Sequence, residues 1–144
     1  MSDLTIITNL LIAFLLGGAI GWLREKEGKS AGLRTHILVA VGSALFMLLS
    51  GQMTAISGLA DPGRIAAGVV TGIGFLGAGC ILQAQGSIKG ITTAASVWIT
   101  AAIGIATGVG FYLGAIATTI IAVITLELLG KVERKIIKSK DSLE

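Results

Sequence analysis

The side chains that could act on a substrate or an ion are few in this sequence, and they gather beside long apolar runs. One group precedes and opens the second run: Arg24, Glu25, Glu27, Arg34, Thr35 and His36. A second group flanks Pro62 and consists of Asp61 and Arg64. A third group opens the fourth run and contains Thr92, Thr93, Ser96 and Trp98.

These residues do not form a known catalytic pattern. The chain has one histidine, no pair of acids at metal-ligand spacing, and neither an H-E-x-x-H, a G-x-S-x-G nor a P-loop motif. Hydrolytic or nucleotide-driven chemistry would need such groups. The sequence therefore predicts a protein that is not an enzyme and needs no cofactor, and it leaves open whether a metal ion is bound.

The second group has two interpretations. Asp61, Pro62 and Arg64 are typical of a helix start, with Asp61 as N-cap and proline at the first helical position. An acid beside a base near a membrane interface can also form a gate or an ion contact. By the same reasoning Thr35 is expected to cap the second helix, with Arg34 reaching toward the lipid headgroups.

Composition indicates which elements must position these groups. Of 144 residues, 53% are hydrophobic and only 13% are charged, whereas soluble domains carry about 25% charged residues. A helix bundle in lipid tolerates this composition because apolar side chains can face outward. The net charge is +3 with seven aromatic residues, and no basic groove with interleaved aromatics is visible. Nucleic acid is therefore excluded as a partner.

The charge-free runs predict five membrane-spanning helices, since a span needs about 20 residues. The first three runs cover residues 4–23, 37–57 and 65–82. The run of residues 90–126 is too long for one helix, and the paired glycines of Gly108-Val109-Gly110 permit a tight turn there. We expect a hairpin of helices over 91–107 and 111–129.

Basic residues predict the orientation of this bundle. Of the 11 Lys and Arg residues, all but Arg64 lie on one side if five helices cross the membrane. The positive-inside rule then places the N-terminus outside and the C-terminus in the cytoplasm. Residues 1–130 are expected to form one transmembrane domain, and residues 131–144 a short basic cytoplasmic tail.

Glycines occur in pairs four residues apart, which places both members on one face of a helix. Close helix packing is expected at Gly17, Gly21, Gly68, Gly72, Gly74, Gly77, Gly79, Gly104 and Gly108. Residues 72–77 match the G-x-G-x-x-G fingerprint, but a dinucleotide site would require a strand before it and a helix after it. Packing inside the bundle and packing between two copies both remain open, and we expect a homodimer.

The order of these motifs resembles the MgtC/SapB family of membrane proteins. The resemblance rests on Ala31-Gly32-Leu33-Arg34-Thr35-His36, on Asp61 with Arg64, on the glycine-rich residues 72–79, and on residues 90–95 followed by Trp98. It extends over about residues 10–129. The chain ends after a short tail, and so it is similar to the short form without a soluble C-terminal domain.

The resemblance implies a bacterial inner-membrane protein linked to magnesium homeostasis, acid stress and virulence in some members. For some members it implies binding and restraint of other membrane proteins, including the proton-translocating ATP synthase, and not magnesium transport. The family commonly has an acid directly before the arginine that matches Arg24, where this chain has Leu23, with Glu25 nearby. The expected function is regulation by contact in the bilayer, and the alternative is a transporter or channel for magnesium or another cation.

Overall fold

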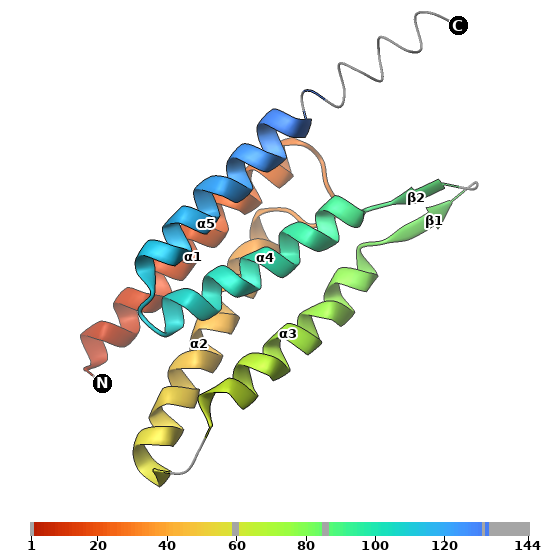
Figure 1. Ribbon diagram of the computed structural model, residues 1–144. Coiled ribbons are helices and arrows are strands. Elements are labelled where there is room, and N and C mark those ends of the chain that lie inside the picture. The colour runs from red at the N-terminus through yellow and green to blue at the C-terminus, as the bar shows by residue number, and fades with distance from the viewer. Residues whose placement is uncertain (1, 59–60, 85–86, 131, 133–144) are drawn as a thin grey trace, which may run out of the picture.

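The protein is a bundle of helices in the computed structural model, which describes residues 2–58, 61–84, 87–130 and 132 (Figure 1). Within these ranges the helices are α1 (Asp3–Lys26), α2 (Leu33–Ser57), α3 (Pro62–Gly79), α4 (Ile91–Gly108) and α5 (Tyr112–Ile124). A π-helical turn, η1 (Thr125–Leu129), continues α5. The strands β1 (Leu82–Ala84) and β2 (Ser87–Lys89) pair antiparallel between α3 and α4.

The predicted all-α membrane bundle is confirmed. Four helical segments of the described residues are long and apolar enough to cross a membrane: α1, α2, α4, and α5 together with η1. The remaining helix, α3, has 18 residues and is rich in glycine. The start of α1 and the end of η1 lie at opposite ends of the bundle in Figure 1, as an odd number of crossings requires.

Local sequence signals explain where several helices begin and end. The Ser2 hydroxyl accepts a hydrogen bond from the Thr5 N–H at the start of α1. The predicted turn between α4 and α5 is confirmed, and Gly110 occupies it with a φ of 79°, a conformation that glycine adopts without a steric penalty. Gly58 ends α2 in the same left-handed region.

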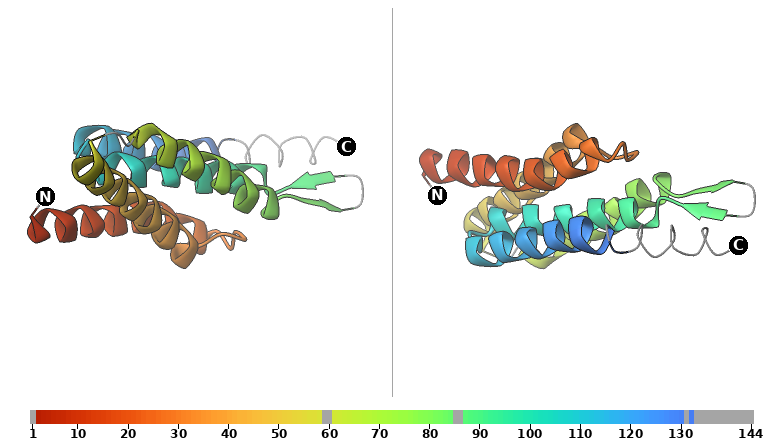
Figure 2. Two further views of the ribbon diagram at one scale, coloured as in Figure 1. Left: turned by 90° about the horizontal axis from the view of Figure 1, so that it is seen from below. Right: turned by 90° about the horizontal axis from the view of Figure 1, so that it is seen from above.

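The hairpin of β1 and β2 was not predicted. The third apolar run was expected to stay helical to residue 82, but α3 ends at Gly79 and the chain turns into β1. Each strand has three residues, which is too short for an alternating pattern to show. The hairpin projects beyond the helices at the end of the bundle where α4 begins (Figure 2).

Glycines let α1 and α4 approach the central helix α2 closely. A Cβ atom at Gly17 would lie 2.7 Å from the Cβ of Ala40, and one at Gly108 would lie 2.6 Å from the carbonyl oxygen of Ala44. A Cβ at Gly104 would overlap the carbonyl oxygen of Ala40. These helices touch through their backbones, as tight packing in lipid requires.

Replacement of Gly104 by alanine should therefore destabilise the bundle, because the new methyl group meets the backbone of α2. We expect a loss of about 1–3 kcal/mol, the usual cost of overpacking, measured as a lower thermal midpoint in detergent. The matched control is Gly74→Ala on α3, where a Cβ meets nothing within 4 Å. Equal midpoints for the two variants would contradict the close crossing.

Candidate functional site

Arg24 is the centre of a buried polar network where α1, α2 and α4 meet. Its side chain is only 2% exposed, although the residue belongs to the last turn of α1. One terminal nitrogen, Nη1, lies 3.0 Å from Oε2 of Glu27, and Nη2 donates to the Thr93 hydroxyl at 2.8 Å. Nε is buried without a hydrogen-bond partner among the described residues. Arg24 thus ties α1 to the first turns of α4.

His36 extends this network into α2. Its Nδ1 donates to the carbonyl oxygen of Gly32 at 2.8 Å, and Nε2 lies 3.1 Å from the hydroxyl of Ser96. The Ser96 hydroxyl donates its proton to the carbonyl oxygen of Thr93 at 2.8 Å. The imidazole is fully buried, so its polar atoms bond within the protein instead of facing an ion or a substrate.

Glu25 caps the second helix, and the role expected for Thr35 was wrong. The helix begins at Leu33, two residues before Thr35, and its N-cap position is Gly32. The free N–H of Leu33 donates to Oε2 of Glu25 at 2.9 Å. This carboxylate lies eight residues upstream, outside the spacing that local capping rules examine. Arg34 is exposed on the first turn.

A second polar connection, which the sequence did not predict, lies at the other end of the bundle. Nδ2 of Asn9 donates to the carbonyl oxygen of Gly108 at 3.3 Å, and the Tyr112 hydroxyl donates to Oδ1 of Asn9 at 2.6 Å. Asn9 is 2% exposed. A lone asparagine in an apolar run was the available signal, since a buried amide needs partners. Together the two connections link α1 to α4 at both ends of the bundle, and the second also links α1 to α5.

The structure confirms Asp61 as the N-cap of α3. Its Oδ1 accepts from the N–H of Gly63 at 2.8 Å, and Pro62 occupies the first turn. Arg64 is exposed, and its side chain makes neither a hydrogen bond nor an ion pair within the described part of the chain. Asp61 and Arg64 thus form no ion pair with each other, as the alternative interpretation of the two as a gate would require.

The polar residues that open α4 separate into two sets. Thr93 and Ser96 are buried in the network, whereas Thr92 and Trp98 are exposed. The expected basic tail, residues 131–144, lies outside the described residues except for Val132. Of the two neighbouring threonines, only Thr93 thus contributes its hydroxyl to the buried network.

The nine glycines expected at packing sites also separate. Four lie at close crossings with α2: Gly17, Gly21, Gly104 and Gly108. Gly77 faces Ala94 of α4 at an ordinary distance of 3.6 Å. At the other four, a Cβ would meet nothing within 4 Å: Gly68, Gly72, Gly74 and Gly79. Packing inside one chain explains the first five and does not explain these four open positions of α3.

The described residues contain no group of three or more His, Cys, Asp or Glu side chains that could hold a metal ion. Arg24, His36 and Asn9 bond across helices, whereas buried hydroxyls such as that of Thr100 bond within their own helix. These features define a multi-pass α-helical membrane protein whose interior is closed by hydrogen bonds at both ends.

Comparison with known proteins identifies the family. A model of the MgtC family matches residues 10–135, and the chain belongs to that family. It is 49% identical to "Putative magnesium transporter YhiD" of Escherichia coli K12, covering 85% of this chain and 59% of that one. It is 45% identical to "Protein MgtC" of Salmonella typhimurium LT2, covering 90% and 54% respectively.

A third relative, "Protein MgtC" of Brucella abortus, is 44% identical over 81% of this chain and 48% of its own length. The chain spans between about half and three fifths of the length of these relatives. No solved structure matches.

The network around Arg24 can be tested with adjacent threonines. Thr93→Val keeps the side-chain shape but removes the acceptor of Nη2, so we expect the unfolding free energy to fall by roughly 1 kcal/mol or more. Thr92→Val removes an exposed hydroxyl and should leave the thermal midpoint in detergent unchanged. If both variants unfold at the wild-type temperature, the buried contact contributes nothing to stability.

Proposed function

We propose that this chain is a regulator in the bacterial inner membrane that acts by contact with other membrane proteins, in connection with magnesium homeostasis. The name of the Escherichia coli relative supplies the link to magnesium. By family resemblance the contacts include the proton-translocating ATP synthase, and the conditions include acid stress and virulence. The chain is not an enzyme in this proposal.

The observation that carries the proposal is the closed interior of the bundle. Arg24, Thr93 and His36 bond one another or their neighbours at one end, and Asn9 and Tyr112 do so at the other. Magnesium gives up its water reluctantly and usually meets carboxylates, and the acids among the described residues all lie at or beside helix ends. In the buried middle of the bundle, an ion would meet apolar and small side chains, and hydroxyl groups that already donate to carbonyl groups of their own helices.

A transporter could still use backbone carbonyls if a helix were unwound in the middle of the membrane. The glycine-rich α3 is where the sequence would allow this. In the structure α3 is a continuous α-helix from Pro62 to Gly79, so its carbonyl groups before the last turn are engaged in helical hydrogen bonds. The name of the Escherichia coli relative makes magnesium transport the second candidate function.

Two assays separate these candidates. Purified protein in liposomes should pass no more magnesium than empty vesicles, because the interior lacks a polar path. The same gene should restore growth of a deletion strain at low magnesium. Flux that Asp61→Asn abolishes, with expression and oligomer size unchanged, would make the protein a transporter with Asp61 at its entrance.

The proposed orientation has its own test. A cysteine at Ser2, in a protein whose Cys80 is replaced by alanine, should react with an impermeant thiol reagent in intact cells. A cysteine at Ser142 should react only after the membrane is permeabilised. Labelling of both from outside would contradict the odd number of crossings.

Association as a homodimer belongs to the same proposal. Gly74 and Gly79 are open on α3, and glycine at such positions lets the backbones of two copies approach each other in lipid. Two chains per particle are expected when the detergent-solubilised protein is sized by light scattering, and a single chain per particle would refute this part.

A further inference from the structure

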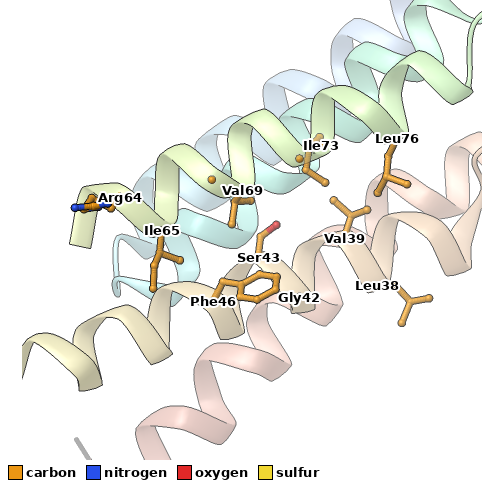
Figure 3. Close-up of a pocket in the computed structure, with 12 residues that line it drawn as sticks. Leu38, Val39, Gly42, Ser43, Phe46, Arg64, Ile65, Val69, Ile73 and Leu76 are labelled. Atoms are coloured by element: carbon orange, nitrogen blue, oxygen red, sulfur yellow. The ribbon is translucent and has the colours of Figure 1, made fainter. Parts of the chain in front are cut away.

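A groove runs between α2 and α3 on the side of the bundle. It has a volume of about 740 Å³, and α2 and α3 supply all of its lining (Figure 3). Apolar walls come from residues such as Val39, Phe46 and Ile73, while Gly68 and Gly72 form part of the α3 side. The groove accounts for the open space beside Gly68 and Gly72, two of the four glycines of α3 at which a Cβ would meet nothing within 4 Å.

The groove cannot hold water well and would be filled in a membrane. Ser43 and Arg64 are the only residues of its lining with a polar side chain, and a water molecule needs two to four polar partners. An empty groove would forfeit the dispersion contacts of its walls. Apolar chains from the surrounding bilayer are the abundant material that can supply those contacts.

Arg64 gives the groove a charged end. In Figure 3 it lies at one end of the lining and Leu76 at the other. Its guanidinium has no partner in the part of the chain that the structure describes. Because α3 begins at Pro62, this unpaired cation lies in the first turn of a helix, where the backbone also favours an anion.

We propose that the groove holds one acyl chain of a phospholipid whose phosphodiester is bound by Arg64. A guanidinium matches the geometry of phosphate oxygens with two parallel hydrogen bonds. The acyl chain below the phosphate then lies along the apolar lining, between Val39 of α2 and Ile73 of α3. One ligand thus occupies the charged end and the apolar length together.

The length of the groove fits a lipid of one leaflet. Arg64 and Leu76 are twelve residues apart, which is about 18 Å along a helix. One leaflet of the hydrocarbon core is about 15 Å thick. A chain anchored at Arg64 would therefore follow the groove to about the middle of the membrane.

The charge at one end of the groove favours a phospholipid over a helix from a second copy, because a phosphodiester supplies the anion that the guanidinium of Arg64 binds. A second copy can still approach through Gly74, which does not line the groove.

Native mass spectrometry of the detergent-solubilised protein can test this inference. The wild-type protein, purified from bacterial membranes, should retain one phospholipid per chain after washing in excess detergent. Arg64→Gln should lower the retained fraction about tenfold or more, because a charge-assisted contact is lost. Arg64→Lys, which keeps the charge, should retain more lipid than Arg64→Gln.

Matched variants identify the site. Gly72→Leu places a side chain into the groove and should abolish retention, whereas Gly74→Leu, on the same helix but outside the groove, should not. Arg34→Gln removes an exposed charge at the start of α2, far along that helix from Phe46, and should retain lipid as the wild type does.

Three outcomes would overturn the proposal. One is equal retention in the wild type, Arg64→Gln and Gly72→Leu. Another is displacement of the lipid by inorganic phosphate, which would make free phosphate the ligand. The third is that Gly72→Leu splits a dimer while lipid remains bound, which would assign the groove to a second copy. None of these outcomes depends on whether the protein regulates partners or conducts magnesium.

Discussion

The crossing of three helices at Ala40 determines the rest of this structure. Ala40 is fully buried on α2, with Gly17 of α1 against its methyl group and Gly104 of α4 against its carbonyl oxygen. Lipid supplies no hydrophobic drive between helices, so the contact must come from close packing and hydrogen bonds. Small residues at this level bring the backbones together, and the ends of the same helices then come within hydrogen-bond reach.

The polar networks depend on that crossing and also stabilise it. Arg24 can reach Thr93, 69 residues away in sequence, because α1 and α4 lie against α2 and against each other. At the other end Asn9 reaches Gly108 and Tyr112 for the same reason. An unsatisfied polar group in lipid is costly, so each network disfavours sliding or rotation of the helices that would break it. α3 has no comparable bond to α1 or α5 among the described residues, and the groove lies on its side of the bundle.

The sequence predicted what depends on local chemistry. Long apolar runs predicted the helices, Gly110 predicted the turn after α4, and Asp61 with Pro62 predicted the start of α3. It did not predict the contacts that depend on tertiary structure. The cap of α2 comes from Glu25 and not from Thr35, because a loop returns that carboxylate to the N–H of Leu33. A glycine pattern indicates a bare helix face, but it cannot say whether another helix of the same chain covers that face, as at Gly104, or leaves it open, as at Gly72.

The glycines differ in what they contact, and this difference determines which surfaces of the protein are open to the surrounding membrane. Where a glycine lies against a backbone, as at Gly17, the surface is already used inside the chain. Where it faces open space, the missing side chain leaves room that lipid or another protein must fill, because a void next to apolar walls loses contact energy on both sides. On α3 this room adjoins the unpaired charge of Arg64, whereas the charge of Arg24 is enclosed by Glu27 and Thr93. The two arginines thus have different roles. Arg24 holds the bundle together, and Arg64 remains available to a ligand from the membrane.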